Sequence, residues 1–243
     1  MINVLIPSMG TSLFFKDSYF PKPLIEVDGE TMLEKVVKNY QELKNAHYIF
    51  VFGKKDCSEF HLDDSARMLT QPNNDVIVLG NETAGALCTC LMAVHQINND
   101  DPLLIVNSDQ IIDVDYEQVL HSFEQQDVDA GVITFESIHP RWSYARIKDN
   151  YVTEVAEKRP LSKTAIAGFY YFRHGTDFIE AAKQVILKGN QLNGRYYISS
   201  SLNEIILMGK KVGYYQVDKN AYHSFYSPDK IEDYERFVRG GIS

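Results

Sequence analysis

The chain has 243 residues, of which 44% are hydrophobic and 23% are charged, and its formal net charge is -9. This length and composition predict one globular domain with a substantial core and argue against long disorder. The acidic balance disfavours nucleic acid as a partner, because neutralising a phosphate backbone needs a basic surface. No apolar run approaches the roughly 18 residues needed to span a bilayer, and the N-terminus does not resemble a signal peptide. We therefore expect a cytoplasmic protein without a membrane span.

The first 27 residues carry three features in a row. Residues 2–6 form a short apolar run that predicts a buried strand. A loop of small residues follows, and its backbone N–H groups are suited to surround a phosphate. This loop consists of Pro7, Ser8, Met9, Gly10, Thr11 and Ser12. Further on, Lys22 lies between two prolines with fixed φ, so its ammonium is presented from a stiff segment. An ordinary turn with a surface lysine explains these residues equally well.

Strands and helices alternate in the first half of the chain. Apolar runs predict strands over residues 2–6, 48–52, 76–79 and 103–106. Helical spacing predicts helices over residues 31–43, 83–97 and 116–123, and a less regular helix between 60 and 69. Strands that are apolar throughout and alternate with amphipathic helices indicate a parallel sheet covered on both faces. The predicted fold class is therefore α/β and Rossmann-like.

The second half is richer in strands. Strands are expected over residues 130–135, 166–172 and 211–217, and an antiparallel hairpin over 142–147 and 151–155. Helices are expected over residues 176–187, 199–208 and 229–238. These strands extend the sheet begun by the first half, so we predict a mostly parallel but mixed sheet.

Ligands of parallel α/β sheets bind beyond the carboxyl ends of the strands, so the loops after the apolar runs are candidate sites. The loop after 76–79 includes Thr83, Ala84, Gly85 and Ala86, whose small side chains let a flat ring approach the backbone. The loop after 103–106 contains Asn107, Ser108 and Asp109. Asp109 is the candidate ligand for Mg²⁺, which takes one or two carboxylates and completes its octahedron with phosphate oxygens and water. A turn-capping role for Asp109 is the alternative. Asp113 and Asp115 are candidate second ligands or solvated turn residues.

A further candidate region follows the predicted hairpin. Glu157 and Lys158 end it, and Gly168 lies inside the next strand. A glycine within a strand is costly unless another group approaches the backbone there. A lysine near that glycine is placed to meet a second phosphate, but a surface ion pair between Glu157 and Lys158 is the simpler reading.

The ordered set of these motifs resembles the sugar-1-phosphate nucleotidyltransferases, or sugar-nucleotide pyrophosphorylases, over residues 1–217. The motifs are Pro21-Lys22-Pro23-Leu24, Thr83-Ala84-Gly85-Ala86, Asn107-Ser108-Asp109-Gln110, Glu157-Lys158 and Gly168-Phe169-Tyr170-Tyr171-Phe172. The resemblance implies a nucleotide-diphospho-sugar transferase (GT-A-like) fold in one domain, residues 1–243. In such a domain, residues 1–127 mainly bind nucleotide, and 128–243 form a β-rich acceptor-binding part with a closing helix.

The resemblance also implies roles for single residues. The 7–12 loop and Lys22 would hold the nucleotide phosphates, residues 83–86 with Asn107 and Ser108 would line the nucleotide, and Asp109 would bind Mg²⁺. Glu157, Lys158 and Gly168 would meet the phosphorylated acceptor. Within the family, the motifs are most similar to those of capsule-associated bacterial members. One of these is the cytidylyltransferase that acts on phosphoglutamine, and this resemblance slightly favours CTP. A homo-oligomer is possible on the same grounds.

Two positions depart from the family pattern. The family loop usually carries an arginine that grips the triphosphate, whereas this loop continues Leu13-Phe14-Phe15-Lys16. The family also has a second metal-binding aspartate before its closing helix, where this chain has Ser224, with His223 and Asp229 nearby. Three functions remain open: transfer of an NMP group from an NTP to a phosphorylated acceptor, nucleotide binding without catalysis, and glycosyl transfer from a finished nucleotide sugar.

Overall fold

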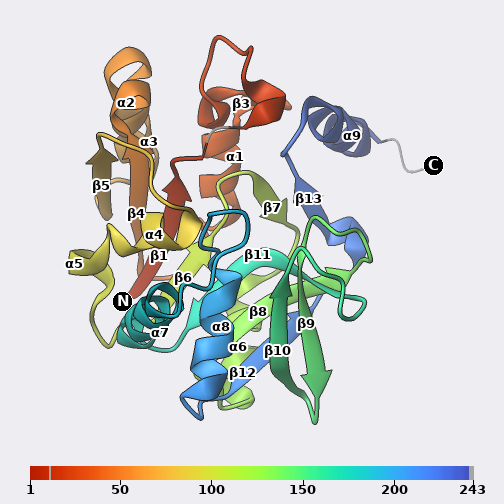
Figure 1. Cartoon of the computed structure of the whole chain (residues 1–243). Helices are drawn as coiled ribbons and strands as arrows, with labels where there is room; N and C mark the ends of the chain where they lie inside the picture. The colour runs from red at the N-terminus through yellow and green to blue at the C-terminus, as the bar shows by residue number, and fades with distance from the viewer. Residues whose placement is uncertain (11, 241–243) are drawn as a thin grey trace.

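The main sheet extends to both sides of β1 (Ile2–Ser8), as Figure 1 shows for the computed structural model, which describes residues 1–10 and 12–240. β1 pairs in parallel with β4 (Ala46–Gly53) and β6 (Leu103–Val106). β4 in turn pairs in parallel with β5 (Asn74–Leu79). These strands contain the four apolar runs, so the predicted parallel half of the sheet is confirmed.

The second half of the chain adds antiparallel strands around β11 (Thr164–Phe172), which pairs with β6, β8 and β9. The added strands are β8 (Ala130–Glu136), β9 (Ser143–Lys148), β10 (Tyr151–Glu157) and β12 (Val212–Gln216). β9 and β10 form the expected hairpin, and β12 pairs in parallel with β8. The main sheet runs in the order β10-β9-β11-β6-β1-β4-β5, with β8 beside β11 and β12 beside β8. This arrangement confirms a mixed α/β sheet.

Both faces of the sheet are buried, because neighbouring residues of the central strands point to opposite sides. In β1, Val4 and Ile6 belong to one hydrophobic core and Leu5 belongs to the other. The first core packs against α1 (Met32–Asn39), α2 (Lys54–Phe60), α3 (Leu62–Thr70) and α6 (Tyr116–Gln125). The second packs against α4 (Ala86–Leu91), α5 (Val94–Ile97), α7 (Gly175–Leu187) and α8 (Ser199–Leu207).

Two helices differ from the prediction. The helix expected between 60 and 69 is divided into α2 and α3 at His61, whose φ of 53° is left-handed. The helix expected over 83–97 begins only at Ala86, because Gly85 has a φ of +125° that a helix does not allow. It is interrupted again between α4 and α5.

Short elements that the sequence did not reveal complete the fold. β7 (Gln110–Ile112) pairs with β13 (Tyr222–Ser224), which brings the C-terminal segment beside the loop after β6. α9 (Pro228–Val238) follows β13 at the upper right of Figure 1, and its Ile231 packs in a hydrophobic cluster with Ile111 and Phe225. The remaining short elements are β2 (Glu26–Val27), β3 (Glu30–Thr31), η1 (Leu13–Phe15), η2 (Lys22–Leu24) and η3 (Lys219–Ala221). Two- and three-residue strands are too short to show an alternating pattern.

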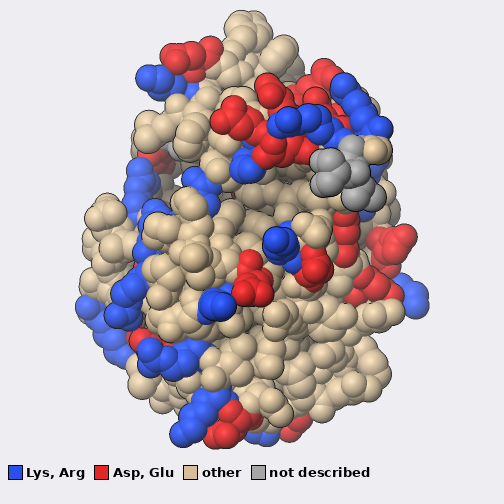
Figure 2. All heavy atoms as spheres, turned by 90° about the vertical axis from the view of Figure 1, so that its right-hand side faces the viewer, with Lys and Arg blue, Asp and Glu red and all other residues tan. Residues whose placement is uncertain are grey.

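The described part of the chain has no helix that is both long enough and apolar enough to cross a membrane. Figure 2 shows acidic and basic side chains side by side at the end of the molecule that carries α9. Lys230 and Arg236 of this helix both pair with Asp233. The cytoplasmic location stays a prediction.

Candidate active site

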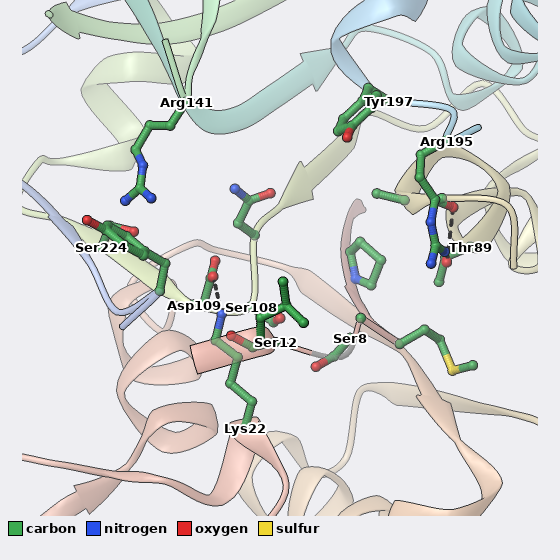
Figure 3. A pocket seen from close by; sticks show the side chains of 18 of the residues that line it. Ser8, Ser12, Lys22, Thr89, Ser108, Asp109, Arg141, Arg195, Tyr197 and Ser224 are labelled. Carbon is green, nitrogen blue, oxygen red and sulfur yellow. Dashed lines mark hydrogen bonds and ion pairs between the residues drawn. The ribbon is translucent and has the colours of Figure 1, made fainter. Parts of the chain in front are cut away.

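The main cavity of the protein lies where β1 and β6 end, at the carboxyl edge of the parallel strands. It has a volume of about 640 Å³. Ser8, the last residue of β1, and Asn107, the first residue after β6, both line it. This is the place where open α/β sheets bind their ligands. Figure 3 shows that side chains from both halves of the chain point into it.

Lys22 and Asp109 form an ion pair in this cavity, although 87 residues separate them. Lys22 begins η2, and the neighbouring Pro23 is buried, so the segment that presents the ammonium is anchored. The backbone carbonyl of Asp109 accepts a hydrogen bond of 2.7 Å from the N–H of Phe225, which fixes the loop after β6. The two side chains are 17% and 26% exposed, so a ligand in the cavity is able to reach both. Figure 3 shows the pair on one side of the cavity.

The small-residue loop after β1 forms another wall of the cavity. Five of its six predicted residues line the cavity, namely Pro7, Ser8, Met9, Gly10 and Ser12, and Thr11 lies outside the described residues. Lys16, the nearest cation in the sequence, is exposed and does not line the cavity. Leu13 and Phe14 line it instead. The loop therefore offers backbone N–H groups and hydroxyls but no positive side chain.

The loop before α4 closes against a segment that the sequence did not single out. Thr83, Gly85 and Ala86 line the cavity, whereas Ala84 does not. The carbonyl of Ala84 accepts a hydrogen bond of 2.8 Å from the N–H of Tyr196. A Cβ on Gly85 would lie 2.5 Å from the carbonyl oxygen of Tyr196, so only glycine permits this contact. Ala84 thus positions the wall and does not form it.

A smaller cavity of about 280 Å³ adjoins the main one and contains the predicted acceptor residues. Glu157 and Lys158 do not pair with each other, so the reading as a surface ion pair is wrong. The Oε2 atom of Glu157 accepts hydrogen bonds from the hydroxyls of Ser143 and Ser199. The Nζ atom of Lys158 donates to the hydroxyl of Tyr197 over 2.8 Å. Glu157 thereby presents its carboxylate to the cavity from a fixed position.

Gly168 also lines the smaller cavity, at an irregularity of β11 between Ile166 and Tyr170. Its φ is +63°, and an added Cβ would lie 2.2 Å from the Nδ2 atom of Asn107. The group that approaches this glycine is therefore the Asn107 side chain. Because Asn107 lines both cavities, Gly168 helps to place a candidate ligand-binding amide.

Among the described residues, Asp109 and Glu82 are the carboxylates that line the main cavity, and Glu82 pairs with Arg195. Asp115 caps α6 by accepting hydrogen bonds from two backbone N–H groups, and Asp113 lies 3.0 Å from the Nε2 atom of His223. Asp229 is exposed in the first turn of α9. None of Asp113, Asp115, His223 and Asp229 lines the main cavity, and a metal-binding role for them stays a prediction. Within the described ranges, no three His, Cys, Asp or Glu side chains are grouped to hold a metal.

This donor set fits a magnesium ion that arrives with its nucleotide, not one held by the protein alone. Ser224 lines the cavity and lies opposite Gln110 in the β7–β13 pair, which places it next to Asp109. One carboxylate and one neutral hydroxyl supply few ligands, and Mg²⁺ normally takes the others from phosphate oxygens and water.

The sequence motifs did not identify several residues that line the main cavity. Among them are Arg141, Trp142, Arg195, Tyr197, Tyr222 and Tyr226. Burial, and then the nearby charge of Asp109, raises the pKa of Tyr222 well above its ordinary value. Its hydroxyl therefore stays protonated and donates a hydrogen bond of 3.1 Å to the side chain of Gln110. The available signal in this loop was a cation directly before an aromatic residue, Arg141-Trp142.

Comparison with known proteins agrees with this geometry. A family model described as nucleotidyl transferase matches residues 17–221. The chain belongs to the nucleotidyl transferase family. The residues of both cavities from Lys22 to Arg195 lie within the matched range, and the resemblance inferred from the ordered motifs is confirmed at the level of the family.

Two curated relatives of this nucleotidyl transferase are about one quarter identical to it. The bifunctional protein GlmU of Methanococcus aeolicus is 25% identical over 217 residues, which cover 79% of this chain and 49% of GlmU. The chain thus spans about half the length of that relative. The UTP–glucose-1-phosphate uridylyltransferase AglF of Haloferax volcanii is 25% identical over 243 residues, which cover 96% of this chain and 94% of AglF.

Solved structures share the fold. A nucleoside-diphosphate-sugar pyrophosphorylase from Vibrio cholerae has a TM-score of 0.80 at 21% identity, with 97% of this chain and 100% of that chain covered. A putative glucose-1-phosphate thymidylyltransferase from Bacillus anthracis has a TM-score of 0.79 at 17% identity, with 99% and 96% covered. The predicted nucleotidyltransferase fold is confirmed.

Proposed function

We propose that this protein transfers an NMP group from a nucleoside triphosphate to a small phosphorylated acceptor and releases pyrophosphate. The observation that carries the proposal is the meeting of Lys22 and Asp109 in one cavity with the uncharged residues Pro7, Ser8, Met9, Gly10 and Ser12. That main cavity adjoins a second one with a fixed carboxylate. Two adjoining cavities suit a reaction between two bound substrates, because holding both in one orientation makes their reaction effectively unimolecular.

In this reaction an oxygen of the acceptor's phosphate attacks the α-phosphorus, and the bond from that phosphorus to the oxygen shared with the β-phosphate breaks. No protein nucleophile is needed, since the attacking oxygen is already anionic. The ammonium of Lys22 moves from Asp109 to the phosphates or contacts both at once, and it offsets the negative charge that develops on the phosphates. Asp109 would hold Mg²⁺ with the nucleotide phosphates, and the ion would supply further positive charge there.

The proposed roles of the other residues follow from their positions. Residues 7–12, with Thr83, Gly85, Ala86, Asn107 and Ser108, bind the nucleotide. Glu157 accepts a hydrogen bond from a hydroxyl or amine of the acceptor. Two serine hydroxyls already donate to its Oε2 atom, so the Oε1 atom is the acceptor for this bond. Both halves of the chain line the main cavity, so the division at residue 127 describes a tendency and not a boundary.

We propose the substrates from the activities of two relatives. AglF is a UTP–glucose-1-phosphate uridylyltransferase, and the Bacillus anthracis protein is a putative glucose-1-phosphate thymidylyltransferase. We infer a pyrimidine nucleotide and a sugar 1-phosphate or similar phosphate ester. The preference for CTP, the role in capsule or surface-polysaccharide precursor synthesis and a homo-oligomeric state rest on resemblance alone.

Nucleotide binding without turnover is the second candidate. It is favoured by the absence of a cation from the described part of the 7–12 loop and by Ser224, which leaves Asp109 as a single carboxylate. Transfer of a sugar from a finished nucleotide sugar is the third, and Asp109 would then hold the metal of that donor.

One panel separates the three candidates. UTP, dTTP, CTP, ATP and GTP are each incubated with Mg²⁺ and with glucose 1-phosphate, glucosamine 1-phosphate or phosphoglutamine, and pyrophosphate is measured. Release that depends on both substrates supports nucleotidyl transfer. A thermal shift with an NTP but no pyrophosphate from any pair supports binding alone, and consumption of UDP-glucose supports glycosyl transfer. Either of the last two results contradicts the proposal.

A further inference from the structure

The guanidinium of Arg141 is the group in this site that the fold itself does not use. Its Nη1 atom is buried and has no hydrogen-bond partner among residues 1–10 and 12–240. An arginine carries five N–H donors and no acceptor. Burying a donor without a partner is unfavourable for folding, so the unpartnered buried Nη1 atom indicates a ligand.

Aromatic side chains hold this guanidinium in place. Its central carbon lies 3.3 Å from the ring centroid of Tyr226 and 5.5 Å from that of Trp142. Stacking on an aromatic face fixes the plane of the guanidinium but leaves its edge free for hydrogen bonds. Figure 3 shows the Arg141 side chain pointing into the cavity, toward the side where Asp109 and Ser224 lie. The arginine is therefore preorganised and not folded back onto the surface.

Arg141 also lies where the two cavities meet. Among the Lys and Arg side chains of the described chain, only Arg141 and Lys158 line both. Lys158 donates to Tyr197, Lys22 pairs with Asp109, and Arg195 donates to the carbonyl of Thr83. Arg141 is the one cation of the site whose polar head lacks such a protein partner.

We propose that Arg141 binds the phosphate of the acceptor at the junction of the two cavities and orients its attacking oxygen. The proposal rests on the proposed function and names a further substrate-binding residue for it. A planar guanidinium matches two phosphate oxygens at once, which leaves the third to face the nucleotide. The uncharged Ser224 is part of the arrangement, because a carboxylate beside Asp109 would compete with the phosphate for Arg141.

The test compares Arg141→Met and Arg141→Lys with a matched control, Arg146→Met. Arg146 lies five residues further along, is exposed, and pairs with Glu154, which also pairs with Arg159. Arg141→Met should raise the KM for the acceptor by about 10- to 100-fold, the effect of losing one or two charge-assisted hydrogen bonds. The KM for the NTP should change by less than about twofold. Arg141→Lys should give an intermediate acceptor KM, since it keeps the positive charge but loses the paired N–H donors of the guanidinium. Arg146→Met should change neither.

A second readout tests the site without turnover. Binding of inorganic phosphate is measured by calorimetry, and the melting temperature of each variant is recorded. Arg141→Met should weaken phosphate binding about tenfold or more and leave the melting temperature unchanged or higher, because it removes an unpartnered buried donor. Arg146→Met should bind phosphate as the unchanged protein does. A structural role for Arg141 predicts the opposite, a lower melting temperature with unchanged phosphate affinity.

The outcomes separate this inference from the proposed function. An unchanged acceptor KM in Arg141→Met, or a raised NTP KM alone, overturns the role of Arg141 while nucleotidyl transfer stands. If no pair of substrates releases pyrophosphate, the proposed function fails. The binding of inorganic phosphate then decides the role of Arg141. Weaker phosphate binding in Arg141→Met but not in Arg146→Met supports a phosphate site, and equal binding in the two variants overturns it.

Discussion

Replacing Gly168 with alanine should disrupt the site through the amide of Asn107. A left-handed φ of +63° costs alanine about 1 kcal/mol relative to glycine. The new Cβ would also lie 2.2 Å from the Nδ2 atom of Asn107 and 2.5 Å from the Oε1 atom of Gln110, two groups that hydrogen-bond to each other over 3.2 Å. Separating them in a buried place costs a further 1–3 kcal/mol or so. The free energy of unfolding should therefore fall by about 2–4 kcal/mol, and the melting temperature by roughly 5–15 °C.

The matched control is Gly189→Ala. Gly189 has nearly the same φ, +61°, but no atom lies within 4 Å of its added Cβ. Gly189→Ala should pay only the cost of the left-handed φ, so its free energy of unfolding should fall by about 1 kcal/mol and its melting temperature by roughly 2–4 °C. Both variants are melted by calorimetry, and binding of UTP is measured on each, where Gly168→Ala alone should bind more weakly. If the two glycines proved equally tolerant, the close approach of Asn107 would not exist and the reasoning for this wall of the cavity would fail.

Three further predictions concern charge, metal and the acceptor site. Burial raises the pKa of Tyr48 to about 12, so its neutral form stabilises the fold fully below pH 10 and this contribution disappears between about pH 10 and 12. Tyr48→Phe should lose less stability than the unchanged protein between these pH values, as measured by urea melts at several pH values. An unaltered slope of the free energy of unfolding against pH would refute this prediction. Asp109→Asn should abolish the NTP-dependent binding of Mn²⁺, measured by electron paramagnetic resonance, whereas Asp113→Asn should retain it. Equal Mn²⁺ binding by the two variants would show that Asp109 is not the ligand. Glu157→Gln should raise the acceptor KM about tenfold without altering UTP affinity, and a change confined to UTP would place Glu157 elsewhere.

The regular part of the fold was predictable because it depends on periodic burial. The runs in β1, β4 and β6 are apolar on both faces, which occurs in parallel strands covered on both sides, and the two cores confirm it. The run in β5 lies at the sheet edge and is only partly buried. The break at His61 was not predictable, because a left-handed histidine is a property of the packed chain and leaves no pattern in composition. The β7–β13 pair escaped detection for a related reason, since its strands are too short for a period.

The candidate site was only partly predictable. Loops after apolar strands identified Ser8, Gly85 and Asp109, because a parallel sheet brings their carboxyl ends to one edge. Ala84 does not line the cavity, and nothing local in the sequence shows that its carbonyl accepts a hydrogen bond from Tyr196. Arg141 and Arg195 come from loops of the second half, and their approach depends on tertiary contacts that one sequence does not reveal.

The most direct test of the central claim is pyrophosphate release by Lys22→Met beside the matched control Lys16→Met. Both changes remove one ammonium from the N-terminal region, but only Lys22 lines the cavity and contacts Asp109. Lys22→Met should lose about 100- to 1,000-fold in kcat, since it removes a preorganised charge from the transferred phosphates, and it should keep a cooperative melt. Lys16→Met should release pyrophosphate like the unchanged protein. Equal rates in the two variants would contradict the assigned role of the Lys22–Asp109 pair.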